Sequence, residues 1–301
     1  MRITPNQISN TVTGNLFQRA GKLVDAQTRV STQKRINRPS DDPAGMSSVL
    51  NYRKTIASID QYQRNVGVAK TRLDIVETTL GMADDLVNQA KRITAANASG
   101  SSDAASRAIA ADQITDIRDQ LLGLANTQQN GVYLFGGRKT DTPPFTADPA
   151  TGVITYVGDN TAGADARYIV GENSEVSVRA NGAEIFTGAE DVFALMADVV
   201  GELSSGAPDT AVIQDRQNRM VDAIDQLRQI RAGNAATYGR LESTENQLSR
   251  FRLGFETALA ETEGVDLAEA ILDLKAEESA YESALAASAR VIQPSLLKFL
   301  G

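Results

Sequence analysis

The chain has 301 residues, a formal net charge of -8 and a sequence pI near 4.8. This acidic balance argues against nucleic acid as a partner, because the phosphate backbone is bound through clustered Lys and Arg side chains. Cys and His are both absent, which excludes disulfides, thiol nucleophiles and metal sites built on these residues. Aromatic residues make up only 5% of the chain, so narrow helical seams are favoured over a wide core.

The first twenty residues, "MRITPNQISNTVTGNLFQRA", lack the continuous apolar core of a cleavable signal peptide. No stretch of the sequence reaches the length needed to span a membrane. We therefore expect no membrane insertion, and either cytosolic residence or export by a route that does not read a Sec signal. Leu16, Leu23 and Val30 lie seven residues apart, which predicts a helix with a thin apolar stripe.

The stretch "RVSTQKRINRPSDDPAGM", residues 29–46, interrupts this helical pattern. Arg38 precedes Pro39 and is biased toward extended geometry, so we expect the first helix to end before it. Asp42 precedes Pro43 and is well placed to cap the next helix. We interpret the stretch as a joint whose charged side chains pair with one another or with another molecule.

Residues 52–90 show a heptad repeat, which predicts a long helix with a partner helix. A helix over residues 44–96 would be on the order of 75 Å long. The two seam lines are Ile59, Val66, Leu73, Leu80 and Val87, and Tyr62, Ala69, Val76, Ala83 and Ala90.

The segment "NASGSSD", residues 97–103, predicts a turn, after which Ser102 or Asp103 caps a helix that folds back on the first. Its seam residues are Ile114, Ile117, Leu121 and Leu124. The C-terminal third repeats the pattern, with seam residues Ile213, Met220, Leu227, Asn234, Leu241, Leu248 and Phe255, and on the other line Ala223, Ile230, Phe251 and Ala258. We expect the polar Asn234 to set the register of this seam.

Residues 136–179 combine turn residues with short β-branched or aromatic runs, and "NGAEIF" supplies a further turn signal at Asn181 and Gly182. This pattern predicts a small β-rich insert. The nearby "GVYLFGGRKT" is not a nucleotide-binding loop, because Gly137 and Arg138 separate the second glycine of such a motif from Lys139.

The last segment is again helical, with Asp266 as a candidate cap. Its seam residues are separated by four or three residues, or by the sum of seven: Leu267, Ile271, Leu274, Tyr281, Leu285, Ile292, Ser295 and Phe299. The stripes at the two ends of the chain are thin, and a two-helix coil this narrow is marginal alone. We expect neighbouring subunits of a polymer to supply the missing burial; without the motif described next, an intramolecular bundle would be as good an interpretation.

The run "STQKRINRPSDDPAGM" resembles the N-terminal signature of the flagellin family. Gln33 stands where the family commonly has Gly, and Pro39 where it has Ala. Three further features resemble the hook-associated junction proteins within that family: the start "MRITPNQ", the run "NGVYLFGGRKTDTPPF" at residues 130–145, and the end "SLLKFLG".

The resemblance implies a mainly α fold, with a long antiparallel helical coiled-coil rod formed by both termini and a small β-rich inserted outer domain. The domains expected from it are 1–42 with 265–301 as the inner core, 43–135 with 206–264 as the helical rod, and 136–205 as the outer insert. It implies no enzymatic activity and no cofactor or metal. The residues it places at assembly interfaces are Leu16, Leu23, Val30, Ser31, Lys34, Arg35, Ile36, Asn37, Ser40, Asp41, Asp42, Pro43, Ala44, Gly45, Leu285, Ile292, Leu296, Leu297, Phe299 and Leu300.

The resemblance further implies a structural part of the bacterial flagellum, secreted through the flagellar export apparatus with a type III export chaperone. The expected partners are copies of the same chain in a ring or helical assembly, the first hook-associated junction protein, and flagellin. A filament flagellin or flagellin-like subunit is the alternative. A coiled-coil adhesin or signalling protein should carry an anchor or signal peptide, and an enzyme should show convergent polar groups; neither pattern is present.

Overall fold

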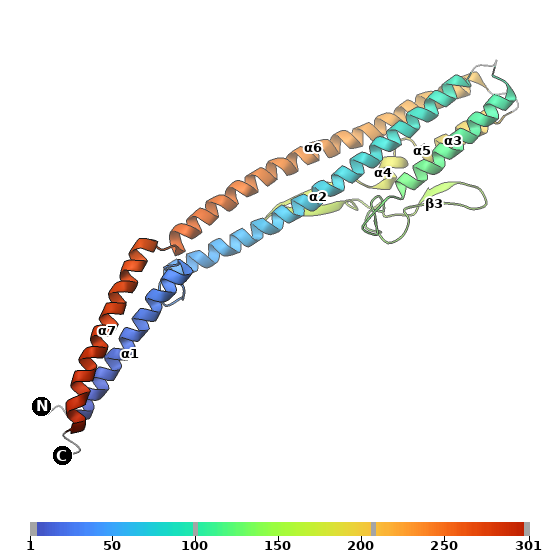
Figure 1. Cartoon of the computed structure of the whole chain (residues 1–301). Coiled ribbons are helices and arrows are strands. Elements are labelled where there is room, and N and C mark those ends of the chain that lie inside the picture. Colours follow the sequence, from blue (N-terminus) through green and yellow to red (C-terminus); the bar gives the residue numbers. More distant parts are fainter. Residues whose placement is uncertain (1–4, 99–101, 206–208, 298–301) are drawn as a thin grey trace. The chain divides into compact units, whose positions relative to one another are not determined.

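The computed structural model describes residues 5–98, 102–205 and 209–297 (Figure 1). Long helices dominate, with small strand pairs between the third and sixth helix. The fold class predicted from the sequence is therefore confirmed. The helices are α1 (Pro5–Thr32), α2 (Pro43–Ala96), α3 (Ala104–Ala125), α4 (Gly182–Phe186), α5 (Val192–Leu203), α6 (Thr210–Glu263) and α7 (Leu267–Leu297).

The chain divides into two compact units. The first contains residues 1–59 and 249–301, and the second contains residues 60–248. Helices α2 and α6 each contribute to both units.

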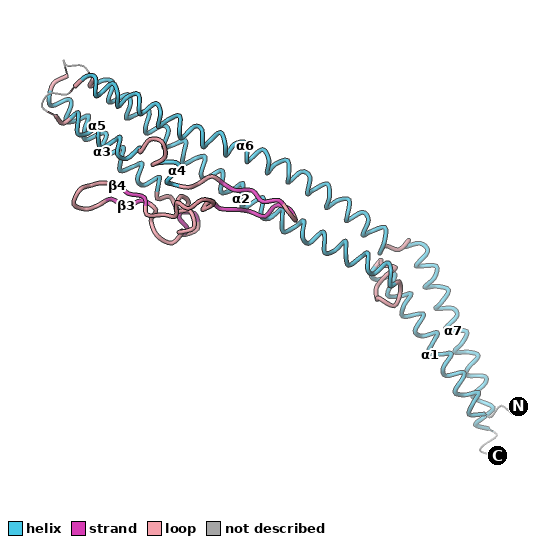
Figure 2. The backbone as a smooth tube through the Cα atoms, turned by 180° about the vertical axis from the view of Figure 1, so that it is seen from behind, coloured by secondary structure: helices cyan, strands magenta, loops and turns pink. Residues whose placement is uncertain are grey.

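In the second unit, α2 and α6 run side by side and antiparallel (Figures 1 and 2). Ion pairs mark the register: Lys70 Nζ lies 3.0 Å from Glu245 Oε2, and Arg231 Nη2 lies 2.6 Å from Glu77 Oε1. The heptad prediction holds because the first seam line is buried along its whole length, as are most members of the second: Ala69, Val76, Ala83 and Ala90. On α6, Phe251 does not follow its predicted seam: its side chain is 51% exposed, because a straight α-helix drifts about 20° per heptad away from a strict seven-residue repeat.

Helix α3 begins as predicted, with the Asp103 carboxylate accepting a hydrogen bond from the Ser106 N–H at 2.6 Å. Its apolar face, Ile114, Ile117 and Leu121, is buried, and α5 packs against it. This packing gives the second unit a third and fourth helix beside the α2 and α6 pair.

In the part of the chain that the structure describes, the strands form three separate antiparallel pairs rather than one sheet, two of them within the predicted β-rich insert and one, β1 with β2, just before it. Phe145, Phe186 and Phe193 pack together in the core of the insert, with ring centroids 5.2–5.8 Å apart, so the few aromatic residues are concentrated here. The strand pairs are β1 (Gln128–Gln129) with β2 (Val132–Tyr133), β3 (Phe145–Ala147) with β4 (Ile154–Tyr156), and β5 (Ala166–Gly171) with β6 (Ser174–Val178).

The turn predicted at Asn181 and Gly182 is wrong. Asn181 instead caps α4, with its side chain accepting a hydrogen bond from the Ala183 N–H at 3.0 Å. Asn is favoured both in turns and at helix starts, so the local sequence does not separate the two. Gly182 has a packing reason, because an added Cβ would lie 2.7 Å from the Phe145 ring and 2.8 Å from the Phe135 carbonyl oxygen.

In the first unit, α1 and α7 lie side by side (Figure 2). Arg19 Nη1 lies 3.3 Å from Glu277 Oε2, and the small side chains of Ala26 and Ala270 are buried. The remaining contacts of this unit form the candidate site.

Candidate assembly surface

Two breaks in the helices of the first unit lie side by side, one at residues 33–42 and one at residues 264–266; together we call them the double joint. The Arg35 N–H donates to the Glu263 carbonyl oxygen at 2.7 Å, and the Val265 N–H donates to the Gln33 carbonyl oxygen at 3.4 Å. The segment between α1 and α2, which contains the flagellin-like signature, is therefore hydrogen-bonded to the segment between α6 and α7.

Gln33, the first residue after α1, has a left-handed backbone conformation with φ 56°. Glycine is the residue that adopts this conformation without steric cost, and it is the usual residue after a helix C-terminus. The flagellin family commonly has Gly at this place, and the geometry gives the physical reason.

Two adjacent carboxylates organise the rest of the first break. Asp41 Oδ2 accepts hydrogen bonds from the Arg38 N–H at 2.7 Å and the Asn37 N–H at 2.9 Å, and these bonds lower the pKa of Asp41. Asp42 Oδ1 accepts from the Gly45 N–H at 2.8 Å, which lowers the pKa of Asp42 and makes it the cap of α2, as predicted.

Gly45 lies against the cap and against a buried side chain. An added Cβ would overlap the Asp42 carboxylate and lie 2.6 Å from Ile36 Cδ1. Ile36 is only 2% exposed, so it has little room to move. The signature thus requires a residue without a side chain at position 45.

Basic side chains connect the two breaks. Arg35 Nη2 donates to the Thr262 carbonyl oxygen at 3.0 Å, and Arg35 Nη1 lies 3.3 Å from Asp42 Oδ2. The Glu263 carboxylate, which is buried, is paired with Lys34 at 3.0 Å and with Arg53 at 2.5 Å. A buried carboxylate is stable when it is paired and hydrogen-bonded, and here two cations serve that purpose.

The predicted interface residues of the signature fall into two sets. One set takes part in contacts within the double joint: Lys34, Arg35, Ile36, Asn37, Asp41, Asp42 and Gly45. The other set is exposed: Ser31, Ser40, Pro43 and Ala44. Sequence reasoning missed Arg53 and Glu263, because nothing local indicates that residues 210 positions apart form one ion pair.

The apolar stripes of α1 and α7 are only partly covered within one chain. Leu16, Leu23 and Val30 are half-buried, and Leu285 is 44% exposed. Two apolar side chains on the same helices are more exposed: Phe17 on α1 is 74% exposed and Leu272 on α7 is 71% exposed.

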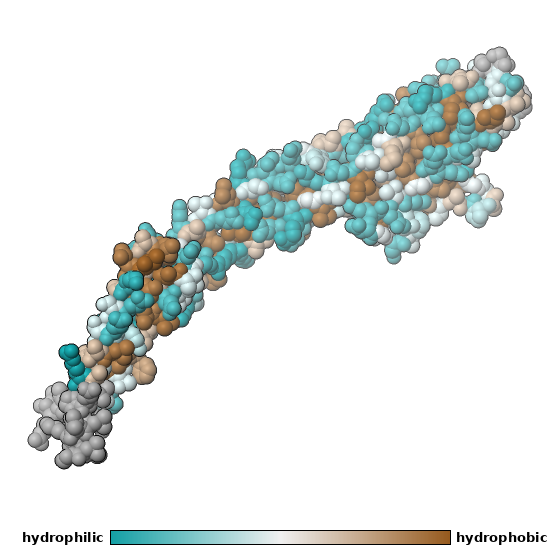
Figure 3. All heavy atoms as spheres, viewed as in Figure 1, coloured by the Kyte–Doolittle hydropathy of each residue, from teal (hydrophilic) through white to brown (hydrophobic). Residues whose placement is uncertain are grey.

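Figure 3 shows hydrophobic residues gathered on the surface of α7 near its start, where Leu267 and Ile271 are exposed. Of the other predicted contacts, Ile292, Leu296 and Leu297 belong to α7 but their side chains are outside the described part of the chain, as are Phe299 and Leu300.

Asn234 has a contact that its seam position did not predict. It is 2% exposed, and its side-chain Nδ2 donates to the Arg179 carbonyl oxygen at 3.0 Å. It therefore fastens the residue after β6 to α6.

Over the described residues, no helix is apolar over a length that could cross a bilayer. Within the same residues, no group of three or more carboxylates is placed to hold a metal ion.

The comparisons with known proteins agree with this geometry. The model of the bacterial flagellin N-terminal helical region matches residues 3–140, which include the first break of the double joint. Flagellar hook-associated protein 3 of Escherichia coli (strain K12) is 28% identical over 286 residues, 86% of each chain. The chain is a homologue of flagellar hook-associated protein 3.

Further relatives support this kinship. Flagellar hook-associated protein 3 of Salmonella typhimurium is 32% identical over 155 residues, 50% of this chain and 48% of that protein. The flagellin of Bacillus subtilis is 26% identical over 277 residues, 89% of this chain and 88% of that protein. Hook-associated protein 3 and flagellin are thus both related to this chain over most of its length.

Solved structures show the same fold. The putative flagellar hook-associated protein from Vibrio parahaemolyticus superposes with a TM-score of 0.68 at 21% identity, covering 74% of this chain and all of that chain. Xanthomonas campestris FlgL gives a TM-score of 0.61 at 18% identity, covering 69% of this chain and 99% of that chain.

Proposed function

We propose that this chain is a structural component of the bacterial flagellum, a hook-associated protein that forms the junction between hook and filament. The observation that carries the proposal is the double joint, in which the residues resembling the flagellin signature form a connected structure, in a homologue of flagellar hook-associated protein 3. No catalytic step is part of this function.

Assembly contacts would come from the surfaces that one chain leaves open. The stripe of Leu16, Leu23 and Val30 is only half-buried within one chain, and removing apolar surface from water stabilises an interface by roughly 25 cal/mol per Å². The C-terminal residues predicted for this surface, Leu285, Ile292, Leu296, Leu297, Phe299 and Leu300, would complete it. The exposed signature residues Ser31, Ser40, Pro43 and Ala44 would contact the adjacent subunit.

In this proposal the segments 1–42 and 265–301 form the inner core of a ring or helical assembly. The segments 43–135 and 206–264 form the next layer, and the insert 136–205 projects outward. The first hook-associated junction protein would bind one face of the ring and flagellin the other. Export through the flagellar type III apparatus, aided by a chaperone, would precede assembly, and the terminal helices would order as neighbours bury them.

A deletion strain tests the junction role. We expect cells without this protein to secrete flagellin monomers yet to grow no filament, and the intact gene to restore filaments. Normal filaments in the deletion strain would refute the role. The alternative, a filament flagellin, is separated by immunogold labelling: a junction protein is labelled only where hook and filament meet, whereas a flagellin is labelled along the filament.

A surface substitution tests the assembly surface separately. Leu272 is 71% exposed, so Leu272→Gln should change the free energy of unfolding of the monomer by less than about 0.5 kcal/mol but reduce incorporation into flagella. The neighbouring, exposed Lys275 provides a matched control in Lys275→Gln. Incorporation of Leu272→Gln at the level of the parent chain would exclude Leu272 from the interface, and a loss in Leu272→Gln larger than in Lys275→Gln would show that the apolar side chain is what matters.

A further inference from the structure

The sequence contains two Asn–Gly pairs, and the structure places them in opposite surroundings. Asn130 and Gly131 are exposed and form the two-residue turn between β1 and β2. Asn181 and Gly182 are buried, and Gly182 packs against the Phe145 ring of the insert's aromatic core. The two pairs therefore share one local chemistry but differ in how freely their atoms move.

An Asn–Gly pair can react with itself in water. The glycine backbone nitrogen, after losing its proton to hydroxide, bonds to the asparagine Cγ, and the side-chain nitrogen leaves as ammonia. Water then breaks one of the two C–N bonds of the five-membered imide ring, which leaves either aspartate or isoaspartate. Glycine favours ring closure because it has no Cβ to shield its nitrogen and the least restricted backbone.

At Asn181 the reacting atoms are held by hydrogen bonds. The Gly182 N–H donates to the Phe135 carbonyl oxygen at 2.9 Å. Asn181 Oδ1 accepts from the Ala183 N–H at 3.0 Å, and its Nδ2 donates to the Asp159 carbonyl oxygen at 3.3 Å. Breaking three hydrogen bonds at about 1 kcal/mol each costs about 3 kcal/mol, which slows the reaction about 100-fold relative to the unfolded chain.

At Asn130 the turn opposes the reaction only weakly. The left-handed conformation, φ 53°, goes with a ψ of about +47°, which turns the Gly131 nitrogen away from the Asn130 side chain, so the turn has to open before the ring can close. Opening is easy because β1 and β2 are two residues long, and a short hairpin is only marginally stable by itself. Losing one backbone hydrogen bond, about 1 kcal/mol, slows the reaction about fivefold.

We infer that Asn130 is a site of spontaneous modification, at which the folded chain loses ammonia and gains an aspartate or isoaspartate, whereas Asn181 is protected. The product carries an additional negative charge. Isoaspartate also adds a methylene group to the main chain inside the two-residue turn, which disturbs the pairing of Gln129 with Val132. The inference does not depend on the assembly role, since the reaction takes place within one chain.

Peptide mass spectrometry of the full chain, incubated in mildly alkaline buffer with and without denaturing guanidinium chloride, tests the inference. In the folded chain we expect Asn130 to react about 20-fold faster than Asn181, the ratio of the two slowing factors. In the denatured chain the two should react at similar rates, because glycine follows both. Cleavage after arginine separates Asn130, Asn181 and Asn234 into the peptides 119–138, 180–216 and 232–240.

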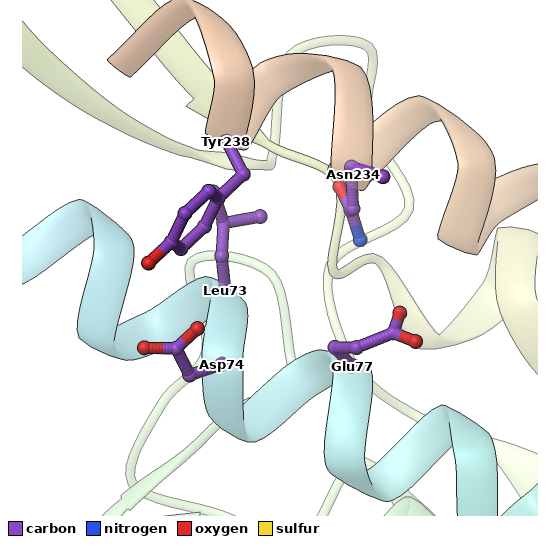
Figure 4. Close-up of a pocket in the computed structure, with 6 residues that line it drawn as sticks. Leu73, Asp74, Glu77, Asn234 and Tyr238 are labelled. Atoms are coloured by element: carbon purple, nitrogen blue, oxygen red, sulfur yellow. The ribbon is translucent and has the colours of Figure 1, made fainter. Parts of the chain in front are cut away.

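Asn234 is an internal reference for slow reaction. It is followed by Ala235, whose Cβ hinders ring closure, and it is 2% exposed. Figure 4 shows it on α6, across from Leu73 and Glu77 on α2. We expect it to be the slowest of the three asparagines in both conditions.

Asn130→Gln is the matched variant, because it keeps the amide but would need a six-membered ring. Peptide 119–138 of this variant should keep its ammonia, whereas continued loss would place the reaction at Asn126 and overturn the inference. Equal rates at Asn130 and Asn181 in the folded chain would also overturn it, as would a folded-chain rate at Asn130 about 100-fold below its denatured rate. A 20-fold difference that persisted in the denatured chain would come from the local sequence and would refute the role of burial.

Discussion

Replacing Gly45 by alanine should open the double joint. The added methyl group would lie 2.6 Å from Ile36 Cδ1 and overlap the Asp42 carboxylate that caps α2. Overpacking against a buried side chain costs about 1–3 kcal/mol, whereas the higher helix propensity of Ala returns about 0.5–1 kcal/mol. The net change is a loss of about 1 kcal/mol, to which displacement of the Asp42 cap adds in the same direction.

Native-state hydrogen exchange of peptides covering residues 33–46 and 260–267 measures this effect, because it reports local opening. Gly254→Ala is the matched control: Gly254 lies in the same unit, on α6, and an added Cβ meets nothing within 4 Å. The propensity gain is common to both variants, so their difference isolates the clash at about 2 kcal/mol, or about 30-fold in the opening equilibrium. Equal protection in the two variants would refute the packing argument for Gly45.

Gln33→Gly should stabilise the joint by about 0.5–1 kcal/mol. Glycine removes the steric cost of the left-handed conformation, roughly 1–2 kcal/mol, but it also makes the unfolded chain more flexible, which offsets part of that gain. A lower urea midpoint of unfolding in the variant would contradict this. Asp41 and Asp42 have pKa values below the usual 3.8 in the folded chain, so their stabilisation is present above pH 3.8 and is lost as the pH falls through the lowered values. The protection of amides in residues 37–46, corrected for the intrinsic pH dependence of amide exchange, should therefore decrease as the pH falls below 3.8, and Asp41→Asn should flatten that dependence; an unchanged profile in the variant would count against it. Phe145→Ala should cost about 3–5 kcal/mol, because Phe145 is 1% exposed in the aromatic core, and thermal unfolding of the insert with exposed Val153→Ala as control measures it; similar melting of both variants would rule out this core.

The long helices could be predicted from the sequence because their signal is local. Val66, Leu73, Leu80 and Val87 recur every seventh residue and are fully or almost fully buried. The helix caps at Asp103 and Asp266 follow from the same short-range rules: the Ala268 N–H donates to Asp266 Oδ1 at 2.8 Å.

The contacts between distant segments could not be predicted in the same way. Glu263 pairs with Lys34 and Arg53 only because the antiparallel helices bring the two breaks together. Asn234 was expected to set a helical register, which stays a prediction, while its contact with Arg179 depends on where the insert folds. Single-sequence patterns describe the faces of helices, but they do not say which other segment covers each face.

The double joint explains why one short signature can hold residues of two kinds. Arg35, Ile36 and Gly45 are fixed by contacts inside the chain, so changing them alters the monomer itself. Ser40 and Ala44 are exposed, so a constraint on them would have to come from another molecule. A substitution at Arg35, Ile36 or Gly45 should therefore change both the hydrogen exchange of the monomer and its assembly. A substitution at Ser40 or Ala44 should change assembly alone. Comparing the two measurements for each variant distinguishes residues that shape the subunit from residues that bind the next one.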